Sequence, residues 1–72
     1  MWRTGSSKRT ANGAIDEAML QFRQFARIMG GRCVLTGLDG DWIEYAIEFK
    51  NEAQWNVLCE KLNELLAMAR KL

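Results

Sequence analysis

The chain has 72 residues, of which 49% are hydrophobic and 26% charged, and its formal net charge is +1. This composition is typical of one small globular domain. The sequence holds no apolar run near the ~20 residues of a membrane-spanning helix and does not begin with the apolar segment of a secretion signal. We therefore expect a cytoplasmic protein without a membrane partner.

Residues 1–11 are mostly polar or basic, and Trp2 is their one aromatic side chain. Because such a segment has little apolar surface to bury, we expect it to form a flexible arm. Residues 12–72 are expected to form a single domain. Thr10 or Asn12 can cap the first helix of that domain.

A helix is predicted over residues 13–29, where apolar residues recur at spacings of three and four. Gly30 and Gly31 follow, and glycine readily adopts the left-handed backbone conformation that ends helices. The predicted apolar face contains Ile15, Ala18, Phe22, Phe25 and Met29.

Two strands are predicted next, over residues 32–38 and 41–50. Apolar and polar side chains alternate along the second, which is typical of a strand with one buried face. The buried face of that strand would consist of Ile43, Tyr45, Ile47 and Phe49.

The two strands are expected to form a hairpin, because Asp-Gly at positions 39–40 is a strong turn signal. A two-residue loop at these positions would place Arg32 on the buried face. Burying an arginine is costly, so we predict a three-residue loop over residues 38–40 instead. This register sets Cys33 and Leu35 beside Tyr45 and Ile43.

A second helix is predicted over residues 51–71. Asn51 with Gln54 three residues later is a variant of the capping box, and Arg70 and Lys71 suit the negative end of the helix dipole. The apolar positions again recur at spacings of three and four; they are Trp55, Leu58, Leu62, Leu65, Ala69 and Leu72.

These elements predict an α+β fold of order α–β–β–α, with two antiparallel helices packed on one face of a β-hairpin. The order is similar to that of shortened double-stranded-RNA-binding or ferredoxin-like units, but element order by itself implies no function. A two-stranded sheet has two open edges. Because residues 33–36 carry no charge, we expect this strand to pair with its copy in a homodimer with a four-stranded sheet. The last helix is the alternative dimer contact.

Several features argue against catalysis. The chain has no histidine, which is the commonest general base. Cys33 and Cys59 are isolated, so we expect two reduced, buried thiols and no metal site. Asp39 and Asp41 are residue types that the turn itself favours. We therefore predict that the protein is not an enzyme and has no catalytic residues, no cofactor and no metal.

The outer face of the hairpin keeps several apolar side chains, which favours a contact with another surface. We predict a small non-enzymatic protein–protein interaction module of the accessory, adaptor or inhibitor type. Its first expected partner is a second copy of itself, and its second is another protein. The candidate interface consists of Val34, Thr36, Leu38, Trp42 and Ala46.

The alternative prediction is weak nucleic-acid binding. Residues 1–32 carry a net charge of +4 and residues 33–72 a net charge of −3, and basic side chains can bind phosphates. The near-neutral total argues against strong binding. The candidate contacts are Lys8, Arg9, Arg23, Arg27 and Arg32.

Overall fold

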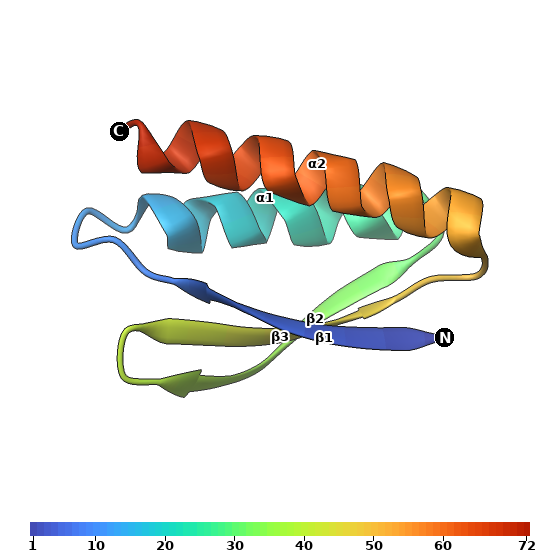
Figure 1. Cartoon of the computed structure of the whole chain (residues 1–72), viewed down its shortest axis with the longest axis horizontal. Coiled ribbons are helices and arrows are strands. Elements are labelled where there is room, and N and C mark those ends of the chain that lie inside the picture. Colours follow the sequence, from blue (N-terminus) through green and yellow to red (C-terminus); the bar gives the residue numbers. More distant parts are fainter.

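Five elements follow one another in the computed structural model, which describes residues 1–72 (Figure 1). Three strands and two helices make one small α+β domain, as predicted for the fold class. In chain order the elements are β1 (Trp2–Lys8), α1 (Ala14–Ile28), β2 (Arg32–Asp39), β3 (Trp42–Glu48) and α2 (Glu52–Arg70).

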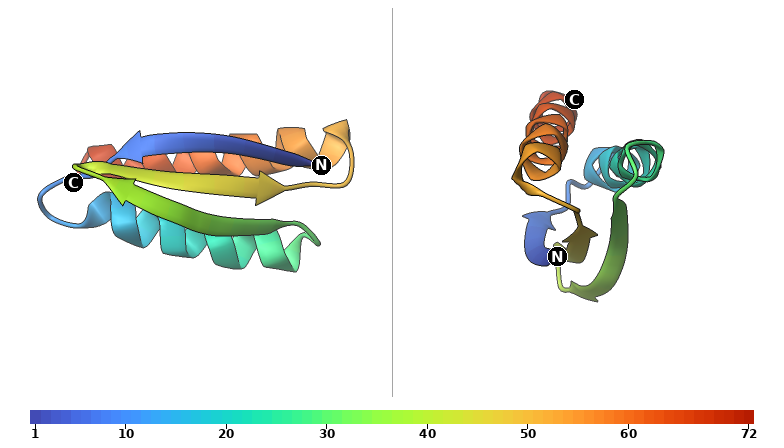
Figure 2. Two further views of the ribbon diagram at one scale, coloured as in Figure 1. Left: turned by 90° about the horizontal axis from the view of Figure 1, so that it is seen from below. Right: turned by 90° about the vertical axis from the view of Figure 1, so that its right-hand side faces the viewer.

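The sheet has the order β1-β3-β2, and β3 pairs antiparallel with both neighbours. The first three elements therefore form a split β-α-β unit, in which β3 lies between the two parallel strands. Both helices lie on the same side of the sheet and run antiparallel to each other, as predicted (Figures 1 and 2). No element covers the opposite side, which we call the open face.

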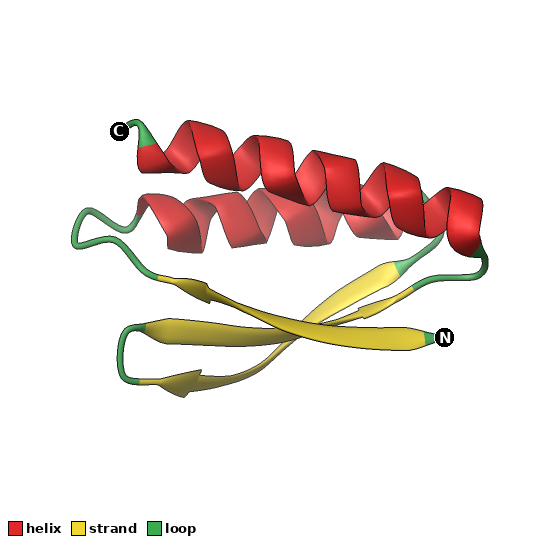
Figure 3. Ribbon diagram, viewed as in Figure 1, coloured by secondary structure: helices red, strands yellow, loops and turns green.

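The expected order α–β–β–α and the expected flexible arm at residues 1–11 are both wrong, because the first residues form strand β1 (Figure 3). β1 pairs with β3 from Trp2 opposite Glu48 to Lys8 opposite Trp42. One edge of the predicted hairpin is thus covered by the chain itself. β2 remains an edge strand, and the expected four-stranded dimer sheet has no support in this arrangement.

The strand β1 fits beside β3 because Gly5 lies beneath the side chain of Tyr45. A Cβ atom at Gly5 would be 2.8 Å from Cζ of the Tyr45 ring, which is closer than atoms can approach. The segment lacks an apolar stripe, so periodicity gives no strand signal there. Its place in the sheet depends on backbone pairing and on this one small residue.

The hairpin register corrects the predicted loop. Asp39 pairs with Trp42, so the turn has two residues, and Gly40 at its first position has φ 59°, as a type II′ turn requires. A bulge at Thr36 then shifts the register by one residue. Because of the bulge, Leu35 and Cys33 still lie on the predicted side of β2, with Leu35 opposite Tyr45 and Cys33 opposite Ile47.

The helix ends largely match the prediction. Asn51 caps α2, and its side-chain oxygen accepts a bond of 2.9 Å from the Gln54 backbone nitrogen. At α1 the N-cap residue is Gly13, and the Asn12 side chain accepts a bond of 3.1 Å from the Ala14 nitrogen. Gly30 follows α1 with φ 84°, as predicted for a terminating glycine.

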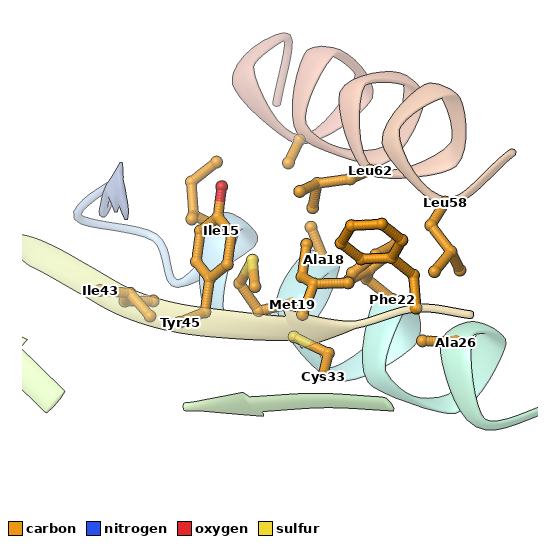
Figure 4. Close-up of a cluster of buried hydrophobic side chains, with 13 residues drawn as sticks. Ile15, Ala18, Met19, Phe22, Ala26, Cys33, Ile43, Tyr45, Leu58 and Leu62 are labelled. Carbon is orange, nitrogen blue, oxygen red and sulfur yellow. The ribbon is translucent and has the colours of Figure 1, made fainter. Parts of the chain in front are cut away.

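The core lies between the helices and the sheet, where side chains from both helices meet those of β3 (Figure 4). Phe22, Leu58 and Ile47 are among its most deeply buried members. The face of β3 that alternation predicted as buried is indeed buried; it consists of Ile43, Tyr45, Ile47 and Phe49.

Candidate interaction surfaces

The open face presents the side chains of alternate residues from all three strands. The register places them in cross-strand rows, because each β3 residue on this face has one partner on β1 and one on β2. A central row contains Thr4, Ala46 and Val34. The outer rows hold Trp2, Glu48 and Arg32 at one end and Lys8, Trp42 and Asp39 at the other.

Two tryptophans dominate this face at opposite ends. Trp2 is 46% exposed and Trp42 is 47% exposed. The Arg32 guanidinium lies 5.1 Å from the centre of the Trp2 ring and 3.6 Å from a Glu48 carboxylate oxygen. The Arg32 side chain thus contacts both Trp2 and Glu48 in this row, as cation–π and ionic contacts allow.

A second surface lies along α1 and the free edge of β2, and we call it the α1–β2 flank. Two hollows follow each other along it, of about 540 Å³ beside the start of β2 and about 450 Å³ beside the hairpin. The first is lined by Leu20, Arg23, Gln24, Arg27 and residues 31–34. The second is lined by Arg9, Asp16, Met19, Ile43 and residues 35–38.

The predicted protein interface is divided between these two surfaces. Val34, Trp42 and Ala46 lie on the open face, where Trp42 is 47% exposed and Ala46 only 8%. Leu38 lines the hollow beside the hairpin and is 66% exposed. Thr36 is the bulge residue and lines both that hollow and a shallow one across the open face.

The predicted basic surface is also divided. Arg23, Arg27 and Arg32 line one hollow together. Arg9 forms two bonds of 3.0 and 2.8 Å with the Asp16 carboxylate, and this pairing raises its pKa. Lys8 lies on the other edge strand, opposite Trp42. Of the predicted basic residues, only Arg23, Arg27 and Arg32 therefore form a cluster.

Sequence reasoning missed Trp2 and Leu35 as surface residues. Trp2 was assigned to an arm, and Leu35 was expected to be buried although it is 46% exposed. No pattern indicated Trp2, because residues 2–8 carry no apolar stripe that would predict a strand. No pattern indicated Leu35, because its exposure follows from α1 not reaching over that part of β2.

The groups with possible chemistry are few. Both cysteines are free thiols, and burial raises the pKa of Cys33 to about 11. The thiol is therefore protonated near neutral pH and unsuited to nucleophilic attack. No group of three or more potential metal ligands occurs in the structure, and neither helix is long and apolar enough to cross a membrane.

No protein-family model, no curated protein and no solved structure matches this chain. These two surfaces are therefore the only features of the molecule that indicate a function.

Proposed function

We propose that the chain is a small non-enzymatic protein–protein interaction module whose binding surface is the open face of the sheet. The observation that carries this proposal is the pair of half-exposed tryptophans, Trp2 and Trp42, on a face that no other element covers. Tryptophan is enriched among the residues that contribute most to protein interfaces. Each ring has a large apolar area that a partner surface could remove from water.

The other side chains of the open face support a protein partner. The row of Thr4, Ala46 and Val34 between the tryptophans is small and mostly apolar, so a partner can approach the sheet closely there. Charges of both signs surround it, as at the rims of protein interfaces. They are Lys8 and Arg32 against Asp39, Glu44 and Glu48.

Nucleic-acid binding has weaker support. On the open face the three acids outnumber the two bases and would repel phosphates. On the α1–β2 flank, Arg32 already pairs with Glu48 at 3.6 Å, which leaves Arg23 and Arg27 without an ionic partner. Two phosphate contacts give little affinity at physiological salt.

The proposal can be tested with an alanine-to-glutamate substitution on the open face and another on α2. Ala46 lies at the centre of the open face, where its neighbours leave it 8% exposed, and Ala67 is exposed on α2. The chain, with a photo-crosslinking residue at Lys8, is used to capture partners from its native cell extract. We expect Ala46→Glu and Trp42→Ala to abolish capture of a defined protein and Ala67→Glu to leave it unchanged.

Circular dichroism would check that each variant keeps its fold. Capture that Ala46→Glu leaves intact, or no captured protein at all, would contradict the assignment of the open face as the binding surface.

A further inference from the structure

The α1–β2 flank carries opposite charges at its two ends. Arg23 and Arg27 lie beside the start of β2, and neither takes part in an ion pair. The hairpin tip at the other end carries Asp39 and Asp41, which are exposed and also lack an ionic partner. The helix has the same polarity, with acidic residues in its first turn and Arg27 in its last.

Exposed apolar side chains lie between the charged ends. Leu20 and Leu35 are each 46% exposed and Leu38 is 66% exposed. They adjoin the two hollows of the flank. A small domain rarely leaves several neighbouring leucines in water unless another surface covers them.

We propose that two copies of the chain associate through their α1–β2 flanks in antiparallel orientation. The hairpin tip of each copy then contacts the arginines of the other, and the leucines meet near the two-fold axis. This contact is made by the α1–β2 flank and shares only Asp39 with the open face, so it does not rest on the function proposed above. A dimer of this kind would carry two tryptophan surfaces.

We propose a second copy as the partner because the acidic end of one flank is complementary in charge to the basic end of another. Asp39 is seven residues from Arg32 along β2, a distance of roughly 23 Å at ~3.3 Å per residue, so these charges cannot meet within one copy. A two-fold axis near the middle of β2 reverses the strand and brings each acidic end to a basic end. The same surface patch serves both copies, as closed dimers require.

The contact is made by side chains and does not extend the sheet. Met1 and Phe49 exchange backbone bonds of 2.9 Å. Hydrogen-bonded pairs alternate along antiparallel strands, so every second residue of β3 bonds to β1 and the residues between them bond to β2. Cys33 and Leu35 lie opposite β3 residues that bond to β1, so their backbone groups point toward the free edge of β2. Cys33 is only 4% exposed, and the bulge at Thr36 interrupts the edge. The edge therefore lacks the continuous row of accessible groups that a four-stranded dimer sheet needs.

A nucleic acid fits the flank less well than a second copy does. Phosphates could bind Arg23 and Arg27 but would be repelled by Asp39 and Asp41. They would also leave the three leucines uncovered. Oligonucleotide binding is consequently the competing outcome of the test.

The test uses two charge-reversed variants of the whole chain. The first carries Arg23→Glu with Arg27→Glu, and the second carries Asp39→Lys with Asp41→Lys. Light scattering and sedimentation give the mass of each across a range of concentrations. We expect the unmodified chain to have twice the mass of one copy and each variant alone to associate more than roughly a hundredfold more weakly, because like charges then face each other at both ends.

An equimolar mixture of the two variants should regain the dimer, because each acidic site then faces a basic one. A control variant, Glu60→Lys with Glu64→Lys on the outer side of α2, should stay dimeric. Circular dichroism confirms folding of all variants. The mixture experiment separates a specific contact from a general effect of charge.

Three results would overturn the proposal: an unmodified chain that is monomeric at every concentration, variants that remain dimeric alone, or a mixture that stays monomeric. Salt-sensitive binding of an oligonucleotide by a monomeric chain, lost in the first variant, would assign the arginines to nucleic acid instead. Capture of a partner by the open face is measured with other variants, Ala46→Glu and Trp42→Ala, so the two proposals can fail separately.

Discussion

The two flanks of this domain use their arginines differently. On the flank where α2 lies over β1, Arg3 lies 4.6 Å from the Trp55 ring centre and 3.7 Å from the Glu52 carboxylate, and Arg70 donates a bond of 3.0 Å to Ser7 Oγ. On the α1–β2 flank, Arg23 and Arg27 have no such partner. One flank is therefore completed by contacts within the chain, whereas the other has charges and leucines available for a partner.

The strand β1 is the critical part of the completed flank, and Gly5→Val should disrupt it most. Extra carbon atoms would collide with the Tyr45 ring, and overpacking of this kind costs about 1–3 kcal/mol or more. We expect a loss near the upper end of this range, measured as the free energy of unfolding in denaturant. Such a loss is a large part of the stability of so small a domain.

The neighbouring substitution Thr4→Val is the control, because Thr4 faces the open side of the sheet. It should leave the free energy of unfolding within about 0.5 kcal/mol. Shortening the opposing side chain with Tyr45→Leu should recover part of the loss caused by Gly5→Val. If Gly5→Val and Thr4→Val are equally stable, β1 does not pass beneath Tyr45.

This strand also marks the limit of what the sequence predicts. Both helices, the hairpin and the buried face of β3 follow from periodicity and from turn and cap residues, which act locally. The pairing of β1 with β3 joins residues that are far apart in the sequence, from Trp2 opposite Glu48 to Lys8 opposite Trp42, and the side chains of β1 are mostly small and polar. Neither periodicity nor propensity reports such a contact.

The surfaces were predicted in part for the same reason. Residue type alone identified Trp42 and the basic side chains as candidate surface residues. How they group on the surface depends on strand β1, which the sequence did not predict. Trp2 joins the open face only because β1 exists, and Arg9 is removed from the basic cluster by Asp16. Leu35 lies on the same side of β2 as Cys33, as predicted, but is 46% exposed, which residue spacing alone does not predict.

Cys33 provides a second way to compare the flanks, because its thiol is buried where α1 covers β2. Burial raises its pKa to about 11 and outweighs the charge of nearby Arg23, which favours the thiolate. In the unfolded chain the thiol ionises near its ordinary pKa of 9.0. Between these two values the unfolded state loses a proton that the folded state keeps, so stability falls as the pH rises from about 9 to 11.

The slope from one such group is at most about 1.4 kcal/mol per pH unit. Denaturant unfolding at several alkaline pH values would measure it. Burial also raises the pKa of Tyr45, so the variant Cys33→Ala should keep a smaller decline. A decline that Cys33→Ala leaves unchanged would mean that the thiol ionises equally easily in both states, and hence that α1 does not seal this part of β2.

The smallest expected effect tests the comparison of the flanks directly. Arg3→Ala and Arg70→Ala should each lower the free energy of unfolding by about 1 kcal/mol. The first loses the contact of Arg3 with the Trp55 ring, and the second loses the hydrogen bond of Arg70 to Ser7. Removing Arg23 or Arg27 from dilute protein should change it by less than about 0.5 kcal/mol. Denaturant titrations of the four variants give these values side by side.

Protein concentration then distinguishes the two kinds of arginine. A residue that acts within one copy contributes the same amount at every concentration, whereas one that contacts a second copy contributes more as the dimer fills. The losses for Arg3 and Arg70 should therefore stay constant, and those for Arg23 and Arg27 should appear only on concentrating the protein. Equal and constant losses at all four positions would remove the distinction between a completed and an available flank, and with it the basis for placing the dimer contact beside β2.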